Sequence, residues 1–184
     1  MSRNLFGPGT IVLGGGAVLL TAVLLVGFFL PTQWSVTVEL RVDATSEAVM
    51  PFLDSPEGWA EWTVWPDSGL TRTGPERGAG AKIAWDDPEL GAGSFSISAA
   101  SAHTVRYAVL VDGAANTLMT TNGTLELEPL GSATMIHWTE SGDLGRNPLM
   151  GFWGLTMEAA QTRELHKSLE QLGELLSSGS APSR

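Results

Sequence analysis

The chain has no cysteine, and its basic residues are few compared with its acidic ones. Without a thiol there is no disulfide framework, no thiolate nucleophile and no cysteine-ligated zinc or iron–sulfur centre. Ten lysines and arginines stand against twenty aspartates and glutamates, which gives a net charge of −10. Because an acidic surface repels phosphate backbones, we expect no nucleic-acid partner.

Metal-binding and phosphate-binding patterns are also missing. The histidines, His103, His137 and His166, have neither H-x-H nor H-x-x-x-H spacing, so we expect no metal site. The glycine-rich segments lack the G-x-x-x-x-G-K-[ST] pattern that surrounds phosphate groups. We therefore predict no cofactor. The N-G-T triplet at Asn122 fits a glycosylation pattern, for which a chance match is the default interpretation.

Residues 11–30 carry no charge and form an apolar run near the start of the chain. A helix of this length rises about 30 Å, which matches the hydrocarbon core of a bilayer. A cleaved signal peptide is the alternative, but its apolar region is shorter and ends at a small-residue site, unlike the sequence LPTQW found here. We expect a tail over residues 1–10 and an uncleaved transmembrane helix over residues 11–30.

The charges around this helix predict its orientation. Arg3 is the sole charged side chain before Glu39, and no cationic cluster follows the helix. By the positive-inside rule, the protein is predicted to be a single-pass membrane protein whose domain lies on the extracytoplasmic side. We expect that domain to cover residues 34–177 and to be followed by a disordered tail over residues 178–184.

Short runs of alternating apolar and polar residues predict an antiparallel sheet. Residues 34–42 place their apolar side chains at every second position, as in a half-buried strand. A short helix should start near Ser46 and end in the S-P-E-G sequence at residues 55–58. Asn122-Gly123 leaves a hairpin turn as an alternative to a continuous strand. Further strands are predicted over residues 79–85, 93–99, 103–111, 118–127 and 132–141.

The chain should end in one long helix over residues 149–177. Asn147 suits the N-cap and Pro148 the first helical position. The second half carries a stripe of leucines that should lie on the sheet. The first half is apolar on every side, which predicts that it is covered all round. Projecting the leucine stripe backwards turns Gly151, Gly154, Met157, Glu158 and Gln161 towards the sheet, and the two glycines suggest open space there.

Three segments carry a family resemblance: WAEWTVWPD at residues 59–67, GPERGAGAKIAW at 74–85 and TMIHWTESGDLGRNPL at 134–149. With the order of elements, they resemble the START-like (SRPBCC) superfamily of polyketide cyclase/dehydrase and lipid transport proteins. The resemblance covers residues 34–176. It implies an α+β helix-grip fold, a curved antiparallel sheet wrapped around the long C-terminal helix, here preceded by the transmembrane helix. It also implies a deep, mostly apolar cavity, and no catalytic signature.

Several side chains are candidates to line this cavity. The group Trp59, Trp62 and Trp65 either fills the core, which we favour, or forms a lid. A carboxylate such as Glu158 carries a burial cost unless it is paired, hydrated or ligand-bound, and a hydrated cavity mouth is the alternative. The predicted ligand-binding residues are Trp62, Trp85, Phe95, Tyr107, Met119, Trp138, Glu140, Trp153, Met157, Glu158 and Gln161.

These observations favour a membrane-anchored carrier or sensor for a hydrophobic small molecule, such as a lipid or a polyketide-like compound. One alternative is a cyclase-like or hydrolase-like enzyme in which Glu140, Glu158 or Tyr107 acts as acid or base. Another is a ligand-free structural module of the cell envelope. Because no nucleophile–base pair stands out in the sequence, we favour a binding protein over an enzyme.

Overall fold

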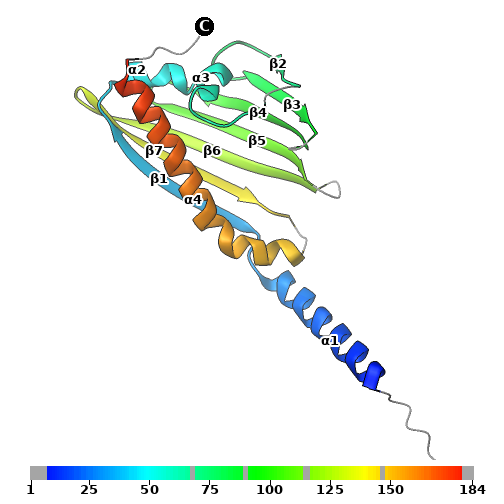
Figure 1. The fold of residues 1–184 in the computed structure, drawn as a ribbon. Coiled ribbons are helices and arrows are strands. Elements are labelled where there is room, and N and C mark those ends of the chain that lie inside the picture. Colours follow the sequence, from blue (N-terminus) through cyan, green and yellow to red (C-terminus); the bar gives the residue numbers. More distant parts are fainter. Residues whose placement is uncertain (1–7, 67–68, 89–90, 114–116, 146–147, 180–184) are drawn as a thin grey trace, which may run out of the picture.

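A computed structural model describes residues 8–66, 69–88, 91–113, 117–145 and 148–179. The chain begins with helix α1 (Pro8–Phe29), forms one sheet with short helical segments beside it, and ends with helix α4 (Pro148–Ser177). In Figure 1, α4 crosses one face of the sheet, and α1 projects away from the domain. The long terminal helix predicted from the sequence is confirmed.

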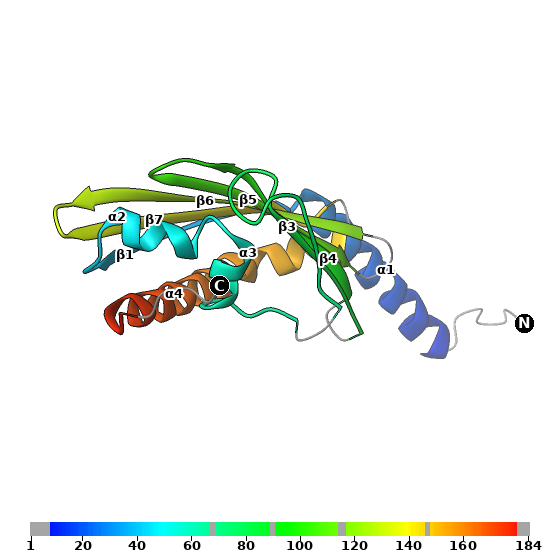
Figure 2. The same cartoon turned by 90° about the horizontal axis from the view of Figure 1, so that it is seen from above.

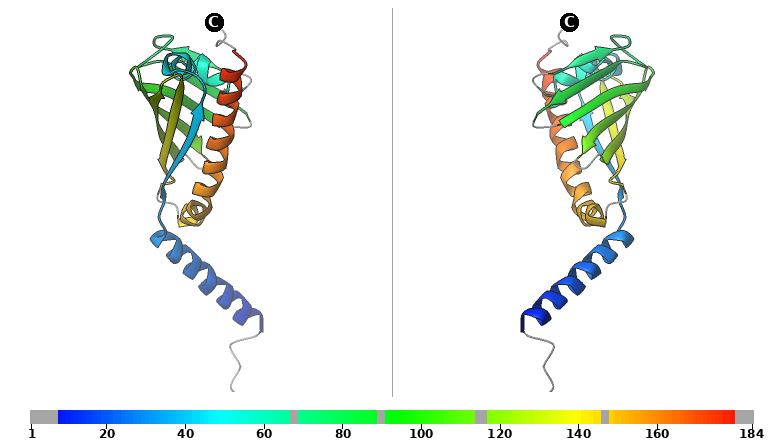
Figure 3. Two further views of the ribbon diagram at one scale, coloured as in Figure 1. Left: turned by 90° about the vertical axis from the view of Figure 1, so that its left-hand side faces the viewer. Right: turned by 90° about the vertical axis from the view of Figure 1, so that its right-hand side faces the viewer.

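The sheet has seven antiparallel strands in the order β1-β7-β6-β5-β4-β3-β2. It curves around α4, as the two side views in Figure 3 show. This α+β arrangement confirms the expected helix-grip fold. The strands are β1 (Gln33–Val42), β2 (Thr71–Thr73), β3 (Lys82–Asp87), β4 (Gly91–Ala100), β5 (Thr104–Gly113), β6 (Thr117–Leu130) and β7 (Ala133–Asp143).

The core lies between the sheet and α4. On β1 the predicted alternation is confirmed, because Trp34, Val36 and Val38 are buried while the residues between them are exposed. From α4, Leu165 and Leu169 pack into the same core. Burying each such side chain contributes about 1.5–3 kcal/mol. Strand β2 was not predicted, because its three residues are polar and exposed and carry no apolar alternation.

The hairpin alternative at Asn122-Gly123 is wrong. Both residues lie in the middle of β6, which pairs with β5 on one side and with β7 on the other. The chain turns instead at Gly131, where φ is +74°. Gly123 is paired with Tyr107 and with Glu140. A glycine at this position is therefore explained by the neighbouring side chains and not by a turn.

The segment between β1 and β2 contains α2 (Ser46–Val49), the 3-10 turn η1 (Met50–Phe52) and α3 (Pro56–Ala60). These elements lie beside α4 on the same face of the sheet (Figure 2). Residues 55–58 were expected only to end a helix, but Ser55 is the N-cap of α3. Its hydroxyl oxygen accepts a hydrogen bond from the Gly58 N–H at 3.0 Å, and Pro56 takes the first helical position.

The first turns of α4 differ from the prediction of complete burial. Leu149 is 54% exposed and Trp153 is 50% exposed, and Phe152 is also exposed. Met150, in contrast, is half-buried against the core, so among the described residues the first turns of α4 are covered on one side and exposed on the other. The side chain of Leu155 and the predicted N-cap Asn147 lie outside the described residues.

Gly151 and Gly154 do not border open space, contrary to the prediction. A Cβ atom at Gly151 would lie 2.7 Å from the carbonyl oxygen of Gly27, and one at Gly154 would lie 2.8 Å from that of Pro31. A Cβ atom at Gly27 would in turn overlap the carbonyl oxygen of Pro148. These glycines therefore let α4 approach the end of α1 and the link that follows it, backbone against backbone.

Helix α1 forms where the transmembrane helix was expected. Its described side chains are largely exposed, and Phe29 is 88% exposed. Within the ranges that the structure describes, no helix is both long enough and apolar enough to cross a membrane. Residues 1–7 and 180–184, which include most of the two predicted tails, lie outside the described ranges, and Ser178 and Gly179 form a turn after α4.

Candidate functional site

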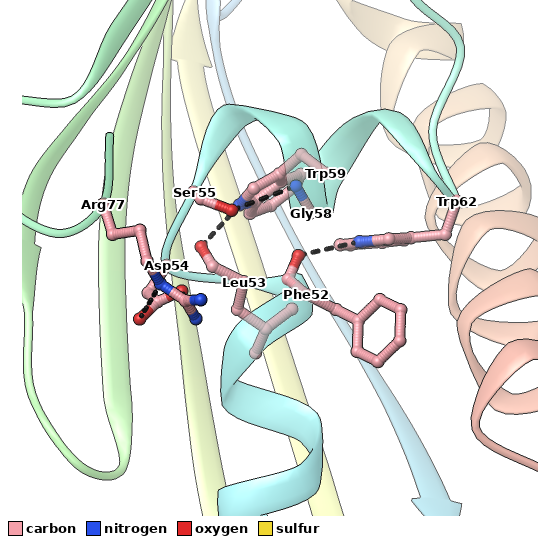
Figure 4. Close-up of polar contacts among 8 residues, drawn as sticks. All are labelled: Phe52, Leu53, Asp54, Ser55, Gly58, Trp59, Trp62 and Arg77. Carbon is pink, nitrogen blue, oxygen red and sulfur yellow. Dashed lines mark hydrogen bonds and ion pairs between the residues drawn. The ribbon is translucent and has the colours of Figure 1, made fainter. Parts of the chain in front are cut away.

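The two tryptophans of the α3 region are fixed by the carbonyl groups of the segment before them (Figure 4). The indole N–H of Trp59 donates to the Leu53 carbonyl oxygen at 2.6 Å, and that of Trp62 donates to the Phe52 carbonyl oxygen at 3.0 Å. Gly58 permits this packing, because a Cβ atom there would overlap the Pro51 carbonyl oxygen. The large rings are thus held in one orientation.

Trp59 is the centre of an aromatic cluster. Its ring centroid lies 4.7 Å from those of Trp62 and Tyr107, 5.1 Å from that of Phe95 and 5.7 Å from that of Trp138. Tilted and edge-to-face contacts of this kind add about 0.5–1.5 kcal/mol per pair beyond area burial. Because Trp59 and Trp62 are buried, they fill the core, as favoured over a lid.

Tyr107, Gly123 and Glu140 form a row across β5, β6 and β7. Gly123 is paired with Tyr107 on one side and with Glu140 on the other. A Cβ atom at Gly123 would overlap the ring of Tyr107. The missing side chain lets the tyrosine ring lie across β6, so that its hydroxyl group reaches the carboxylate on the next strand.

The row belongs to a hydrogen-bonded network at the helix–sheet boundary. The Trp138 indole N–H donates to the Tyr107 hydroxyl oxygen at 2.8 Å, and the Tyr107 hydroxyl donates to Glu140 Oε1. Gln161 on α4 donates from Nε2 to Glu140 Oε2 at 2.6 Å. Glu140 is only 5% exposed, and none of the ion pairs among the described residues includes it.

Burial shifts the ionisation of both acidic groups in this network. Desolvation raises the pKa of Glu140, and the hydrogen bonds from Tyr107 and Gln161 offset this only in part. Desolvation also raises the pKa of Tyr107 well above its ordinary value, and the nearby carboxylate adds to the effect. Tyr107 therefore remains a hydroxyl donor at neutral pH, and Glu140 takes up a proton more readily than an exposed glutamate.

A cleft of about 270 Å³ opens beside this network. Its floor is formed by buried groups such as Tyr107, Trp138 and Glu140, and its mouth by exposed ones, including Val64, which is 91% exposed. Aromatic rings dominate the walls. The lining residues are Trp59, Thr63, Val64, Trp65, Trp85, Phe95, Tyr107, Val109, Trp138, Glu140, Gln161, Glu164, Leu165 and Ser168.

The structure brings together part of the predicted ligand-binding set. The residues that line the cleft are Trp85, Phe95, Tyr107, Trp138, Glu140 and Gln161. The others lie elsewhere: Trp62 is buried beside the cleft, Met119 is half-buried on β6, Met157 is half-buried against the core, and Trp153 and Glu158 are exposed. Whether any of them contacts a ligand stays a prediction.

The cleft lies further along α4 than predicted. We expected a hollow beneath Gly151 and Gly154, but α4 contributes Gln161, Glu164, Leu165 and Ser168 instead. These four follow the i, i+3, i+4, i+7 spacing and so share one helix face. The spacing was available in the sequence, but the two glycines, which in fact contact the region of α1, drew the prediction towards the start of the helix.

A curved antiparallel sheet that grips one long helix over a cleft defines the helix-grip class of domain. Residues 33–177 match the family described as polyketide cyclase / dehydrase and lipid transport. The match covers most of the chain, and the chain belongs to this family. No curated protein matches the chain in sequence.

Solved structures share the fold at low sequence identity. Mll3558 from Rhizobium loti is 17% identical with a TM-score of 0.55, over 77% of this chain and 96% of that one. The Aha1 dimer from Colwellia psychrerythraea is 16% identical with a TM-score of 0.53, over 78% and 96%. A norcoclaurine synthase mutant from Thalictrum flavum, in complex with a transition-state analogue, is 13% identical with a TM-score of 0.60, over 80% and 96%. At these identities the likeness concerns the fold alone.

The row across the sheet predicts that Gly123→Ala is destabilising. The added Cβ atom overlaps the Tyr107 ring, which must move and so break its hydrogen bond to Glu140. We expect the free energy of unfolding to fall by about 1–3 kcal/mol, measured by denaturant titration of the full chain in detergent micelles. Gly173→Ala is the control, because its Cβ atom lies 3.4 Å from Leu40 and so causes no overlap. Equal stability of Gly123→Ala and the unmodified protein would contradict the packing.

The raised pKa of Glu140 predicts a pH-dependent stability difference from Glu140→Gln. Above the ordinary glutamate pKa of 4.5, the folded state keeps a proton at Glu140 that the unfolded state has lost, so the unmodified protein loses stability as pH rises through this window. The glutamine variant carries no charge, and both hydrogen bonds survive if the Gln161 amide turns over. We expect its relative stability to grow with pH in urea titrations.

Glu164→Gln is the matched control for this pH series, because Glu164 lines the exposed mouth of the same cleft. Its stability relative to the unmodified protein should not change with pH in the same way. If the curves for Glu140→Gln and for the unmodified protein run parallel across the series, the carboxylate does not sit in the desolvated position described.

Proposed function

We propose that the protein binds a small hydrophobic molecule in the cleft between α3, the sheet and α4, and that α1 holds this cleft beside a membrane. The observation that carries the first part is the lining. Six aromatic and three aliphatic side chains line the space, together with five polar ones, of which Glu140 is buried and Glu164 is exposed. Pockets for organic ligands are mostly apolar, with a small number of placed polar groups.

The size of the cleft favours a compact ligand. A volume of about 270 Å³ corresponds to roughly nine water molecules at ~30 Å³ each. That is at the small end of ligand pockets, and it suits a molecule with one or two rings better than a lipid with two acyl chains. The family of polyketide cyclase / dehydrase and lipid transport proteins supports a role with hydrophobic compounds.

A cyclase-like or hydrolase-like enzyme is the second candidate function. It is favoured by the position of Glu140, a carboxylate with a raised pKa on the floor of a cleft, where a general acid could reach a bound molecule. Both carboxylate oxygens already accept hydrogen bonds, from Tyr107 and from Gln161. Because such bonding holds the carboxyl group in place, we favour binding over catalysis.

The proposed membrane attachment is supported by the apolar run at residues 11–30 and by the exposed surface of α1. The exposed side chains Leu149 and Trp153 continue this surface onto the first turns of α4, next to the end of α1. Tryptophan is enriched where proteins pass the membrane–water interface. An insertion of α1 would leave these side chains in contact with lipid instead of water.

The proposed location is a membrane, with a single pass and the domain on the extracytoplasmic side. The orientation follows from the absence of a basic cluster after residue 30, while Arg3 lies before the apolar run. In this position the cleft is close to the phase in which hydrophobic molecules concentrate.

Filling the cleft should remove a co-purifying ligand. In Ser168→Phe a ring enters the cleft from α4 and occupies the space of the ligand. We expect organic extracts of the purified full chain to contain a compound that is missing from extracts of this variant, when both are analysed by mass spectrometry. A chemically altered product in the unmodified protein would instead support the enzyme.

The control is Ala159→Phe, which adds the same ring at an exposed position of α4 outside the cleft. Lipids held by α1 should appear in all three extracts and cancel in the comparison. Identical extracts from the unmodified protein and from Ser168→Phe would count against a ligand in this cleft.

Charged residues within α1 should release the protein from membranes. Leu19 and Val23 lie one turn apart on α1 and are exposed. A lysine at the centre of a membrane helix is unfavourable by about 2.5–3.5 kcal/mol. We expect the full chain to sediment with membranes after an alkaline wash, and Leu19→Lys with Val23→Lys to shift it to the supernatant.

Leu130→Lys serves as the control for this fractionation, because Leu130 is an exposed leucine at the end of β6 and not on α1. It should sediment like the unmodified protein. Recovery of the unmodified chain in the supernatant would show that α1 does not attach it to a membrane.

A further inference from the structure

The floor of the cleft contains a buried carboxyl group that has no cationic partner among the described residues. Glu140 accepts hydrogen bonds from two neutral groups, the Tyr107 hydroxyl and the Gln161 amide. No described ion pair includes it, although the side chain is almost fully buried. A buried carboxylate without a cation is unfavourable, and a cation brought into the same site would offset that cost.

The walls around this carboxylate also favour a positive charge. The faces of tryptophan, tyrosine and phenylalanine rings carry negative potential and attract cations within about 6 Å of the ring centroid. Tryptophan is the strongest of the three, and the cleft is lined by four of them: Trp59, Trp65, Trp85 and Trp138. Among the described lining residues there is no lysine, arginine or histidine.

We propose that the ligand of this cleft is a compact organic cation, a protonated amine attached to an apolar or aromatic body, whose ammonium group lies against Glu140. This inference rests on the proposed function, because it requires that the cleft bind a small molecule. The inference specifies the ligand class. The apolar body of the ligand contacts the aromatic walls, and its ammonium group contacts the carboxylate of Glu140.

Glu140 has the acceptor capacity that this contact needs. Each carboxylate oxygen has two lone-pair positions, and one hydrogen bond to each oxygen leaves one position free on each. Tyr107 and Gln161 hold the carboxylate from β5 and from α4, so that an arriving ammonium group meets a fixed acceptor. A charge-assisted hydrogen bond of this kind is roughly twice as strong as a neutral one.

The mouth of the cleft also favours a positively charged ligand. Glu164 lines it and is exposed, so a cation approaching the cleft meets a second carboxylate before it reaches the floor. The net charge of −10 attracts cations over a longer range. An anionic head group would meet two carboxylates and no basic side chain among the described lining residues. Fatty acids and phosphate-bearing lipids are therefore disfavoured as occupants of the floor.

Three probes that share one aromatic body separate these possibilities: 1-naphthylmethylamine, 1-naphthylmethanol and 1-naphthoate. They are positively charged, neutral and negatively charged at neutral pH. Their affinities should be measured by titration calorimetry on the full chain in phosphatidylcholine nanodiscs. The Ser168→Phe variant in the same nanodiscs measures the background signal, which comes from partitioning of the probe into lipid and from its contact with α1.

We expect the amine to bind roughly tenfold or more tightly than the alcohol, and the acid to bind more weakly than both. In Glu140→Gln the advantage of the amine over the alcohol should be lost, while the alcohol keeps its affinity because the aromatic walls are unchanged. In Glu164→Gln the amine should lose only a small part of its advantage, since that group is exposed.

The outcomes distinguish this inference from the proposed function. If the alcohol or the acid binds at least as tightly as the amine, and Ser168→Phe abolishes that binding, the cleft is a ligand site but not one for cations. If none of the probes binds beyond the Ser168→Phe signal, both proposals are overturned. If Glu140→Gln does not fold, the order of the three affinities on the unmodified protein still shows whether the cleft prefers a cation.

Discussion

The hydrogen bond from the Tyr107 hydroxyl to Glu140 is the contact on which the rest of the domain depends. A carboxylate as deeply buried as Glu140 is unfavourable without donors, and Tyr107 and Gln161 supply them from β5 and from α4. To reach Glu140, the tyrosine ring must cross β6, which requires Gly123 in register with both residues. A shift of one residue in either strand pairing would place the acid and the ring on opposite faces. The network therefore links the sheet register to the position of α4.

The aromatic cluster extends this constraint to the other wall of the cleft. Trp59 packs against Tyr107 and Trp138 of the network, while its own indole N–H is held by the Leu53 carbonyl. Trp65 continues the wall towards Phe95 and Trp85, with centroid distances of 5.4 and 6.1 Å. Because Trp59 and Trp62 occupy the deep core and Trp65 stands at its edge, the space between sheet and helix is reduced to a side cleft. The domain is thus filled at its centre and open at one margin.

Helices and strands whose apolar residues recur with a regular period could be predicted from the sequence. Contacts between residues that are distant in the chain could not. The alternation of β1 and the leucine stripe of α4 reflect burial along one element, which a sequence pattern records directly. Gly123 fits either a turn or a strand in the sequence, because a glycine is required there by the Tyr107 ring, which lies on the neighbouring strand but sixteen residues earlier in the chain. Gly151 and Gly154 suggested space, but they contact another backbone. A glycine in the sequence marks a position without a side chain, but the sequence does not show which group occupies the space that a side chain would take.

The contact between α1 and α4 gives the cleft a defined position relative to the start of the domain. Gly154 contacts the link after α1, and the cleft begins at Gln161 and continues to Ser168 on the same helix. At ~1.5 Å per residue, these positions are about 10 and 20 Å further along α4. If α1 lies in a bilayer as proposed, the cleft lies on the domain, outside the hydrocarbon. An amphiphile with an ammonium group exposes that group at the membrane–water interface, on the side of the domain, whereas a purely apolar molecule lies deeper. The location of the cleft and the carboxyl group on its floor therefore favour the same class of ligand.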